Sequence, residues 1–234
     1  MGSAALFFSL QPQRALLSDI NSELIDTYLA VQNHPRAINN RLQRFSVSAE
    51  SYYELRAQEP CKLNDLDRAA RFIFLNRYCF NGLYRTNRDG HFNVPYSPSK
   101  TGQLPSLERL METAAVLRTA RIEHKDYTTI LRDEVCAGDF VYMDPPYAVS
   151  NRRIFRQYGP QEFGIEDLQE LAGLLPVLDK RGARFLVSYA YTTEAVRLFD
   201  GWNTKRLYTN RNIAGFARHR RRACEILVSN FTSS

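Results

Sequence analysis

The tetrapeptide Asp144-Pro145-Pro146-Tyr147 follows the apolar run FVYM and is the most specific chemical feature of the sequence. Two consecutive prolines remove two backbone donors and restrict the turn, and their carbonyl oxygens remain as acceptors. Asp144 adds a carboxylate at a fixed point, and Tyr147 adds a flat ring. The arrangement suits a planar substrate that bears an amino group. A plain turn or a ligand for a partner domain is the alternative, which the position after an apolar strand disfavours.

Aspartates also end two other predicted strands, at Asp19 and Asp126, and the strand after Asp144 is predicted to end at Ser188-Tyr189. The carboxyl ends of parallel strands meet at one edge of a sheet, where ligands of open α/β folds bind. Carboxylates there could hold a metal ion or the hydroxyl and amino groups of a cofactor, although aspartate is also common in loops. The four histidines are dispersed along the chain, so we expect no metal.

Strands and helices alternate at both ends of the chain, which favours an α/β fold with an open, mostly parallel sheet and helices on both faces. A strand over 14–19 precedes a helix that begins behind Asn21 and Ser22. Two late strands close the sheet. The remaining strand–helix pairs and these late strands are expected over 120–133, 139–180, 183–199, 204–210 and 224–230.

The alternation stops between residues 31 and 118. Helical periodicity covers 35–45, 48–58 and 65–77. The segment 83–95, here called the hairpin segment, holds two apolar stretches around Arg88-Asp89-Gly90, and Asp-Gly is a strong tight-turn signal. We therefore expect one domain formed by 1–30 and 119–234, and an insert over 31–118 that contacts a partner.

Composition is that of a globular protein, with 44% hydrophobic and 24% charged residues in 234. No apolar run approaches the ~20 residues of a membrane helix, and no signal peptide is seen, so we expect a cytoplasmic protein. The net charge is +6, and 26 of the 31 cations are arginine, which suits nucleic acid or reflects high genomic GC content. The four scattered cysteines are expected to be reduced core residues.

The motif DPPY after an apolar strand resembles the catalytic motif of amino-group methyltransferases that use S-adenosylmethionine. Further segments are similar to the Dam-type DNA adenine N6-methyltransferases. The segment LLSDINSELIDTY (16–28) resembles their second motif, and RAARFIFLNRYCFNGLYRTNRDGHFNVPYS (68–97) resembles their DNA-recognition segment. Two more segments resemble the later strands of that family: RFLVSYAY (184–191) and RRRACEILVSNF (220–231). The resemblance covers most of residues 2–231 and implies a Rossmann-like catalytic domain.

The resemblance implies that an adenine is rotated out of duplex DNA and methylated at N6. Asp144 and the Pro145 carbonyl would accept hydrogen bonds from N6, and Tyr147 would stack on the base. Asp19 would accept the ribose hydroxyls of the cofactor, and Asp126 its adenine amino group. The implied cofactor residues are Gly2, Ser3, Ala4, Asp19, Asp126, Tyr127 and Asp144. One chain suffices for this chemistry, so we expect a monomer.

For DNA, the resemblance implies that Phe80 and Asn81 wedge into the duplex. Leu83, Arg85 and Pro95 would touch base edges, and arginine to guanine is the commonest specific contact in the major groove. Arg88 would contact phosphate. The implied target is GATC. Packing within the hairpin segment is the alternative role for Phe80, Leu83 and Pro95.

Relatives carry about one more strand ahead of Gly2 and, before it, a short motif that contacts cofactor and DNA. A catalytically inactive DNA-binding remnant is therefore the alternative interpretation, and a cofactor titration would separate the two. Enzymes that methylate cytosine N4 or protein glutamine usually have serine or asparagine ahead of the two prolines, so Asp144 argues against both. Methylation of RNA adenine is disfavoured by the Dam-like hairpin segment.

Overall fold

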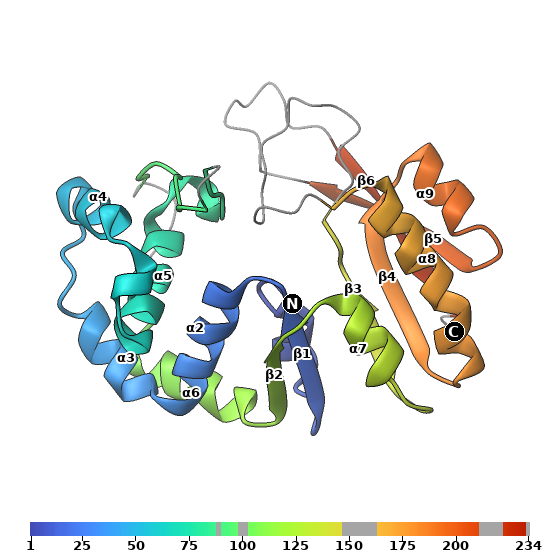
Figure 1. Ribbon diagram of the computed structural model, residues 1–234, viewed down its shortest axis with the longest axis horizontal. Coiled ribbons are helices and arrows are strands. Elements are labelled where there is room, and N and C mark those ends of the chain that lie inside the picture. Colours follow the sequence, from blue (N-terminus) through green and yellow to red (C-terminus); the bar gives the residue numbers. More distant parts are fainter. Residues whose placement is uncertain (88–89, 98–102, 147–162, 211–221, 233–234) are drawn as a thin grey trace. The chain divides into compact units, whose positions relative to one another are not determined.

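The computed structural model describes residues 1–87, 90–97, 103–146, 163–210 and 222–232. These residues form two compact units, which we call the first unit (Met1–Asp126) and the second unit (from Tyr127 onward). Each unit has its own hydrophobic core. Figure 1 colours the first unit from blue to green and the second from yellow-green to red. No helix among the described residues is both long and apolar enough to span a membrane.

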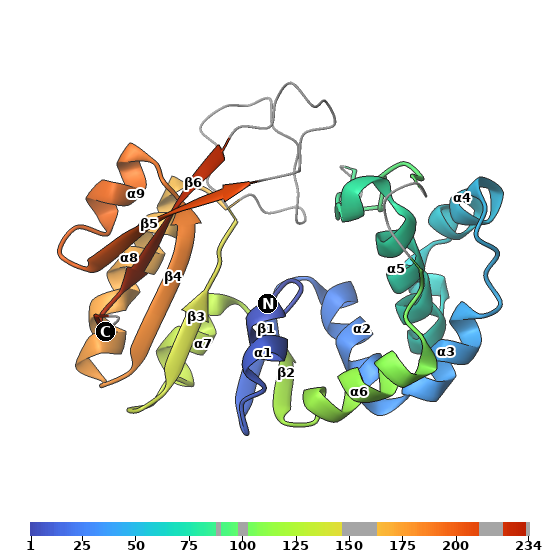
Figure 2. The same cartoon turned by 180° about the vertical axis from the view of Figure 1, so that it is seen from behind.

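The first unit contains a two-stranded parallel sheet in which Asp19 lies opposite His124. The helix after β1 starts at the predicted place because the Asn21 side chain accepts a hydrogen bond from Leu24 N at 3.2 Å. A short helix, α1, precedes β1 and is seen best from behind in Figure 2. The elements are α1 (Ala5–Leu10), β1 (Ala15–Asp19), α2 (Ser22–Asn33) and β2 (Ala120–His124).

Helices fill the rest of the first unit, as the sequence predicts for residues 31–118. Helix α5 is central: it packs against α2, α3 and α4, and its Ala70 and Phe74 are fully buried. The helices are α3 (Pro35–Leu42), α4 (Ala49–Ala57), α5 (Asp65–Tyr78) and α6 (Leu107–Leu117). Helix α6 is not among the elements predicted from the sequence, although Ser106 caps it by accepting a hydrogen bond from Arg109 N at 3.2 Å.

The described residues of the hairpin segment pair antiparallel as predicted, but none of them belongs to a regular strand. An isolated bridge joins Thr86 and Phe92, and Asn93 N donates to Arg85 O at 3.0 Å. The ladder stops near Val94, because its carbonyl oxygen accepts from the side chains of Tyr52 and Arg56 instead of from a facing strand. Side-chain anchors thus supplement the backbone hydrogen bonds of the hairpin segment.

The second unit contains a four-stranded sheet in the order β3-β4-β6-β5. Strands β3 and β4 are parallel, whereas β6 runs antiparallel to both β4 and β5. Leu171, Leu175 and Phe185 are fully buried between α8 and the sheet. The elements are α7 (Tyr127–Asp133), β3 (Phe140–Met143), α8 (Ile165–Lys180), β4 (Arg184–Ala190), α9 (Thr193–Leu198), β5 (Asn203–Asn210) and β6 (Arg222–Ser229).

The prediction of an α/β fold with parallel strands is confirmed, but the described strands are mixed rather than mostly parallel. They lie in two sheets, and two of the four strand pairs are antiparallel. The reason is that β6 inserts between β4 and β5. Periodicity finds a strand but does not fix the neighbour with which it pairs.

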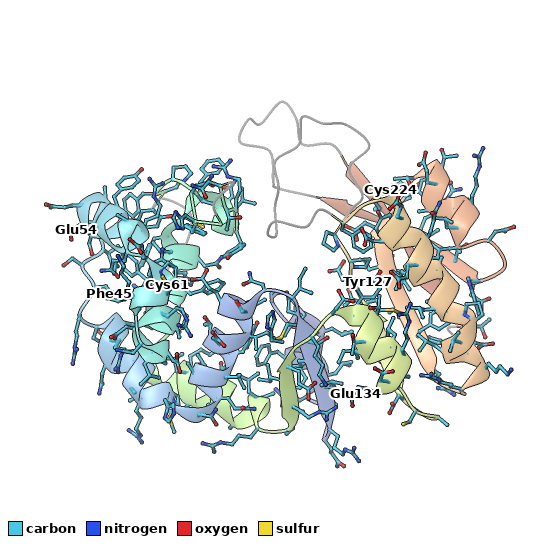
Figure 3. All side chains as sticks on the ribbon, in the orientation of Figure 1. Phe45, Glu54, Cys61, Tyr127, Glu134 and Cys224 are labelled. Carbon is cyan, nitrogen blue, oxygen red and sulfur yellow. The ribbon has the colours of Figure 1, made fainter. Side chains whose placement is uncertain are left out.

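The cysteines follow the prediction only in part. The Cys79 thiol is buried, and burial raises its pKa to about 11. Its Sγ donates to the carbonyl oxygens of Asn76 and Leu83 at 3.2 Å. Cys61 and Cys136 are exposed, so the expectation of core thiols is wrong for these two. Figure 3 labels Cys61 in the first unit and Cys224 on β6.

Candidate active site

Asp144 follows β3 directly and is exposed, while Pro145 is half-buried. Strand β3 pairs in parallel with β4, in the register Met143 to Val187, so the turn begins at the carboxyl edge of this pair. Burial and the neighbouring Asp144 carboxylate raise the pKa of the Tyr142 hydroxyl. Asp144 and the two prolines thus follow the carboxyl end of β3, which is where the sequence predicts them. Tyr147 lies outside the described residues.

The predicted end of the next strand is wrong. Ser188 and Tyr189 lie inside β4, which continues to Ala190, and both are buried. Tyr189 is 1% exposed and packs edge-on against Phe199, with ring centroids 6.4 Å apart. Apolar packing on this side chain extends the strand beyond the polar residue at which it was expected to end.

Asp19 ends β1 and is surrounded by hydrogen-bond donors. Its Oδ2 accepts from the amino-terminal nitrogen of Met1 at 2.9 Å and from Gly2 N at 3.1 Å, and its Oδ1 accepts from Asn21 N at 3.0 Å. Burial by itself raises the pKa of Asp19, but the nearby ammonium and these hydrogen bonds outweigh it and hold the pKa below the ordinary value. Asp19 is therefore an ionised acceptor near neutral pH.

Asp126 lies two residues beyond the end of β2 and is exposed. Because β1 and β2 are parallel and Asp19 faces His124, Asp19 and Asp126 lie at the same edge of the two-stranded sheet. His124 Nε2 lies 2.9 Å from Ile20 O and links the two strand ends. The structure thus brings together two of the predicted carboxylates.

Tyr127 is the first residue of α7, as Figure 3 shows. Its hydroxyl donates to Asp167 O at 3.0 Å, and its ring centroid lies 6.3 Å from that of Phe163. These contacts connect α7 with the first turn of α8. Tyr127 and Asp144 belong to the second unit, whereas the carboxylates Asp19 and Asp126 belong to the first.

The loop before α1 adopts the left-handed backbone region at Gly2 and Ala4, with φ of 51° and 50°. A side-chain carbon placed at Gly2 would meet no atom within 4 Å, so there is open space beside this backbone. Ala4 is buried and Ser3 is exposed. A left-handed alanine costs about 1 kcal/mol or more relative to glycine, so a glycine would suit position 4 better.

Tyr28 is a residue of this edge that the sequence analysis missed. Its hydroxyl donates to Gly2 O at 3.1 Å, and its ring stacks on Phe8 with centroids 6.5 Å apart. It therefore fixes the loop that carries Gly2. Its signal in the sequence is only one more aromatic residue on the apolar face of α2, which is indistinguishable from core packing.

Tyr28 should make the protein sensitive to alkali. Burial, helped by the Asp19 carboxylate, raises its pKa from 10.0 to about 12. The stability that the neutral hydroxyl contributes is complete below pH 10 and is lost as the pH rises towards 12, by about 2 kcal/mol. Urea unfolding at pH 8 to 12 should show that Tyr28→Phe reduces this loss. Tyr208→Phe, at an exposed side chain, should not reduce it; equal alkaline slopes for Tyr28→Phe and the parent would contradict the prediction.

The predicted DNA-contact residues in and beside the hairpin segment differ in burial. Phe80 N donates to Pro95 O at 2.9 Å, and Asn81 adopts a left-handed φ of 55°. Phe80 and Leu83 are partly buried and pack against the core of the first unit, whereas Pro95 is exposed. Phe80 and Leu83 therefore contribute to the packing of the first unit.

Arg85 is half-buried and held across the hairpin segment. Its Nε donates to Asn93 Oδ1 at 2.7 Å, and its Nη2 lies 3.4 Å from Asn93 O. The guanidinium is thus placed relative to both arms of the segment. Arg88 and the arginines between 152 and 156 and between 211 and 221 lie outside the described residues. Among the described residues, no group of His, Cys, Asp or Glu could hold a metal ion.

Comparison with known proteins gives the family. The model of the D12 class of N6 adenine-specific DNA methyltransferases matches residues 1–213. The chain is 34% identical to the type II methyltransferase M.MjaIII of Methanocaldococcus jannaschii, over 91% of this chain and 79% of that protein. It is 32% identical to M1.LlaDCHI of Lactococcus lactis subsp. cremoris, over 99% and 84%. It is 30% identical to a DNA adenine methylase of Vibrio cholerae, over 97% and 84%.

The residues at the first-unit edge fit the methyl donor of this family. Asp19 offers oxygens that can accept hydrogen bonds from hydroxyl groups, and the backbone beside Gly2 is open. Asp126 adds an exposed acceptor at the same edge. With the family model matching most of its length, the chain belongs to the D12 class of N6 adenine-specific DNA methyltransferases, which take their methyl group from S-adenosylmethionine.

Proposed function

We propose that this DNA adenine methyltransferase methylates N6 of the adenine in GATC, in duplex DNA, after that adenine is rotated out of the helix. The observation that carries the proposal is the exposed Asp144 directly after β3, followed by Pro145 and Pro146. This turn offers the acceptors that an exocyclic amine requires. An adenine inside a duplex cannot reach such a turn, so the base must leave the stack.

Asp144 and the carbonyl oxygen of Pro145 would accept the two hydrogens of N6. The amine lone pair is delocalised into the adenine ring, and these hydrogen bonds favour a more pyramidal, more nucleophilic nitrogen. Pro146 restricts the turn, because its ring fixes φ and removes a donor. Tyr147 is proposed to stack on the rotated base. Positioning and electrostatics supply most of the rate enhancement in such a transfer.

The proposed cofactor residues all come from the predicted catalytic domain, 1–30 and 119–234. S-adenosylmethionine supplies the methyl group on its sulfonium. Asp19 would accept its ribose hydroxyls, and Asp126 its adenine amino group. The backbone of Gly2, Ser3 and Ala4 would lie against its methionine part. Tyr127 would contact the adenine ring, and Asp144 would border the transferred methyl.

DNA recognition is assigned to the insert, residues 31–118. Phe80 and Asn81 would enter the duplex at the end of α5. Arg85 would read a guanine, since a bidentate arginine is the commonest specific reader of that base. Leu83 and Pro95 would contact base edges, and Arg88 a phosphate. Arg85 is supported by its fixed position on Asn93, and Pro95 by its exposure.

The test uses the purified chain, S-adenosylmethionine and DNA duplexes of equal length. One duplex holds a single unmethylated GATC, and the others change each of its four base pairs in turn. Mass spectrometry should detect N6-methyladenine at GATC at a rate at least about fivefold above every altered site, since one mismatch costs about 1–3 kcal/mol. Equal rates at all sites would contradict the target, and binding to GATC without any methyladenine would favour the inactive remnant.

Base rotation has a separate readout. Placing 2-aminopurine at the target position should give a rise in fluorescence when the chain binds, because the base loses its stacking partners. The matched control places 2-aminopurine one turn of the duplex away, where no rise is expected. An equal response at both positions would argue against rotation of the target base.

A further inference from the structure

A buried polar cluster joins α2, α5 and the hairpin segment, all within the first unit. It consists of Glu23 near the start of α2, Arg71 on α5 and Tyr84 in the hairpin segment. Tyr84 Oη donates to Glu23 Oε2 at 3.2 Å, and Arg71 Nη1 lies 3.5 Å from Glu23 Oε1. None of the three has a role in the proposed chemistry. Figure 1 shows α2 and α5 as neighbouring helices below the hairpin segment.

The charges of the cluster depend on one another. Arg71 is 2% exposed, and the side chain of Glu23 is 18% exposed. Within the described part of the chain, the buried Oε1 of Glu23 accepts no hydrogen bond, so Arg71 is its main compensation. Burial raises the pKa of the Tyr84 hydroxyl, and the Glu23 carboxylate raises it further. The hydroxyl therefore stays protonated and remains a donor to a charged acceptor, which makes a strong hydrogen bond.

The cluster reaches both arms of the hairpin segment. Tyr84 precedes Arg85 in the first arm. Arg71 donates to Leu55 O at 2.8 Å and to Arg56 O at 3.2 Å, at the end of α4. Arg56 in turn donates to Val94 O at 3.2 Å, and Val94 precedes Pro95 in the second arm. The buried Arg71 guanidinium thus contacts both Glu23, which binds Tyr84 beside Arg85, and the end of α4, which binds Val94 beside Pro95.

The cluster also lies beside the cofactor edge. Asn21 is bound to Asp19 through its backbone and begins the helix that carries Glu23. The Asn21 side chain also lowers the pKa of the Tyr84 hydroxyl, against the larger effects of burial and the Glu23 carboxylate. The start of α2 therefore contacts the proposed ribose acceptor through Asn21 N and the hairpin segment through Glu23.

We infer that Tyr84 is a positioning residue for target recognition: its hydroxyl, held by Glu23, fixes the backbone that carries Arg85. The inference rests on the proposed function, in which the hairpin segment reads DNA. Tyr84 does not contact DNA in this role. It sets the register of the first arm against α2, and Arg71 keeps Glu23 in place to receive the hydroxyl.

The test removes the hydroxyl with Tyr84→Phe and measures kcat/KM for GATC and for the four altered duplexes. The ratio of kcat/KM for GATC to that for each altered site should fall about fivefold or more. The matched control is Tyr96→Phe, which removes the hydroxyl of a ring that packs on Tyr52 with centroids 5.2 Å apart. Among the described residues, that hydroxyl has no hydrogen-bond partner. Tyr96→Phe should leave the ratio unchanged.

A second variant, Glu23→Ala, should lower the ratio as Tyr84→Phe does, and the double variant should be no worse than Glu23→Ala alone. A purely structural role would lower the thermal stability and the rates on all duplexes together, without changing their ratio. A ratio within about twofold of the parent in Tyr84→Phe, or an equal loss in Tyr96→Phe, overturns the inference.

The variant Arg85→Ala distinguishes failure of the positioning role of Tyr84 from failure of the proposed reading of DNA by the hairpin segment. If Arg85→Ala abolishes discrimination and Tyr84→Phe does not change it, the hairpin segment reads DNA and only the positioning role of Tyr84 is wrong. If Arg85→Ala also leaves discrimination intact, the proposed reading of DNA by the hairpin segment is wrong, and the inference is wrong with it.

Discussion

Replacing Asp144 by alanine is expected to lower the rate of adenine methylation by about 10²- to 10³-fold or more. The exposed carboxylate directly after β3 is the group proposed to accept a hydrogen bond from N6. Alanine cannot accept it, so the amine would keep its delocalised lone pair and lose its alignment. The measurement is the single-turnover rate of N6-methyladenine formation on a GATC duplex, at saturating S-adenosylmethionine.

Two further variants define the cause of this loss. Asp144→Asn keeps an oxygen acceptor without the charge and should retain more activity than Asp144→Ala. Asp133→Ala removes an exposed carboxylate at the end of α7, in the same unit, and should methylate at the parent rate. Because Asp144 is also proposed to border the cofactor, cofactor affinity is titrated in parallel. A variant with alanine at 144 that keeps more than about a tenth of the parent rate would contradict the assignment.

The sequence predicts the local structure of this protein well, because each signal is physical and short-range. Asn21 marks the start of α2 since its side chain caps that helix, and the apolar run FVYM marks β3 ahead of Asp144. Helix α6 is not among the predicted elements, even though Ser106 caps it. The sequence predicts a strand end at Ser188-Tyr189, whereas β4 continues to Ala190 and Tyr189 is buried within it.

The hydrogen bonds of the site residues could not be predicted from the sequence as the helices and strands could. Asp19 was assigned from its place after a strand, and the structure adds the donors that surround it. Tyr28 and Tyr84 resemble ordinary core tyrosines in the sequence, since nothing local distinguishes a hydroxyl that binds Gly2 O or Glu23 from one that does not. Such roles depend on residues distant in the chain, and only the fold brings them together.

Replacing Arg71 by methionine should destabilise the first unit by about 3–5 kcal/mol. Burial lowers the pKa of this guanidinium, and the Glu23 carboxylate opposes that shift, with smaller contributions from Tyr84 and Tyr52. Methionine fills similar volume but leaves Glu23 and the carbonyl oxygens of Leu55 and Arg56 without their donor. The measurement is the free energy of unfolding in urea. Hydrogen exchange, read in peptides of α5, reports the loss in the first unit separately from the second.

The matched control for the expected loss of stability in Arg71→Met is Arg41→Met. Arg41 is also on a helix of the first unit and pairs with Asp67 at 2.6 Å, but the two side chains are 24% and 43% exposed. Water screens that pair, so its removal should cost at most about 1 kcal/mol. Adding Glu23→Gln to Arg71→Met should restore part of the stability, because the uncompensated buried carboxylate is then gone. A loss for Arg71→Met no larger than that for Arg41→Met would mean that water reaches the cluster. The Glu23–Tyr84 hydrogen bond would then be too weak to hold the hairpin segment.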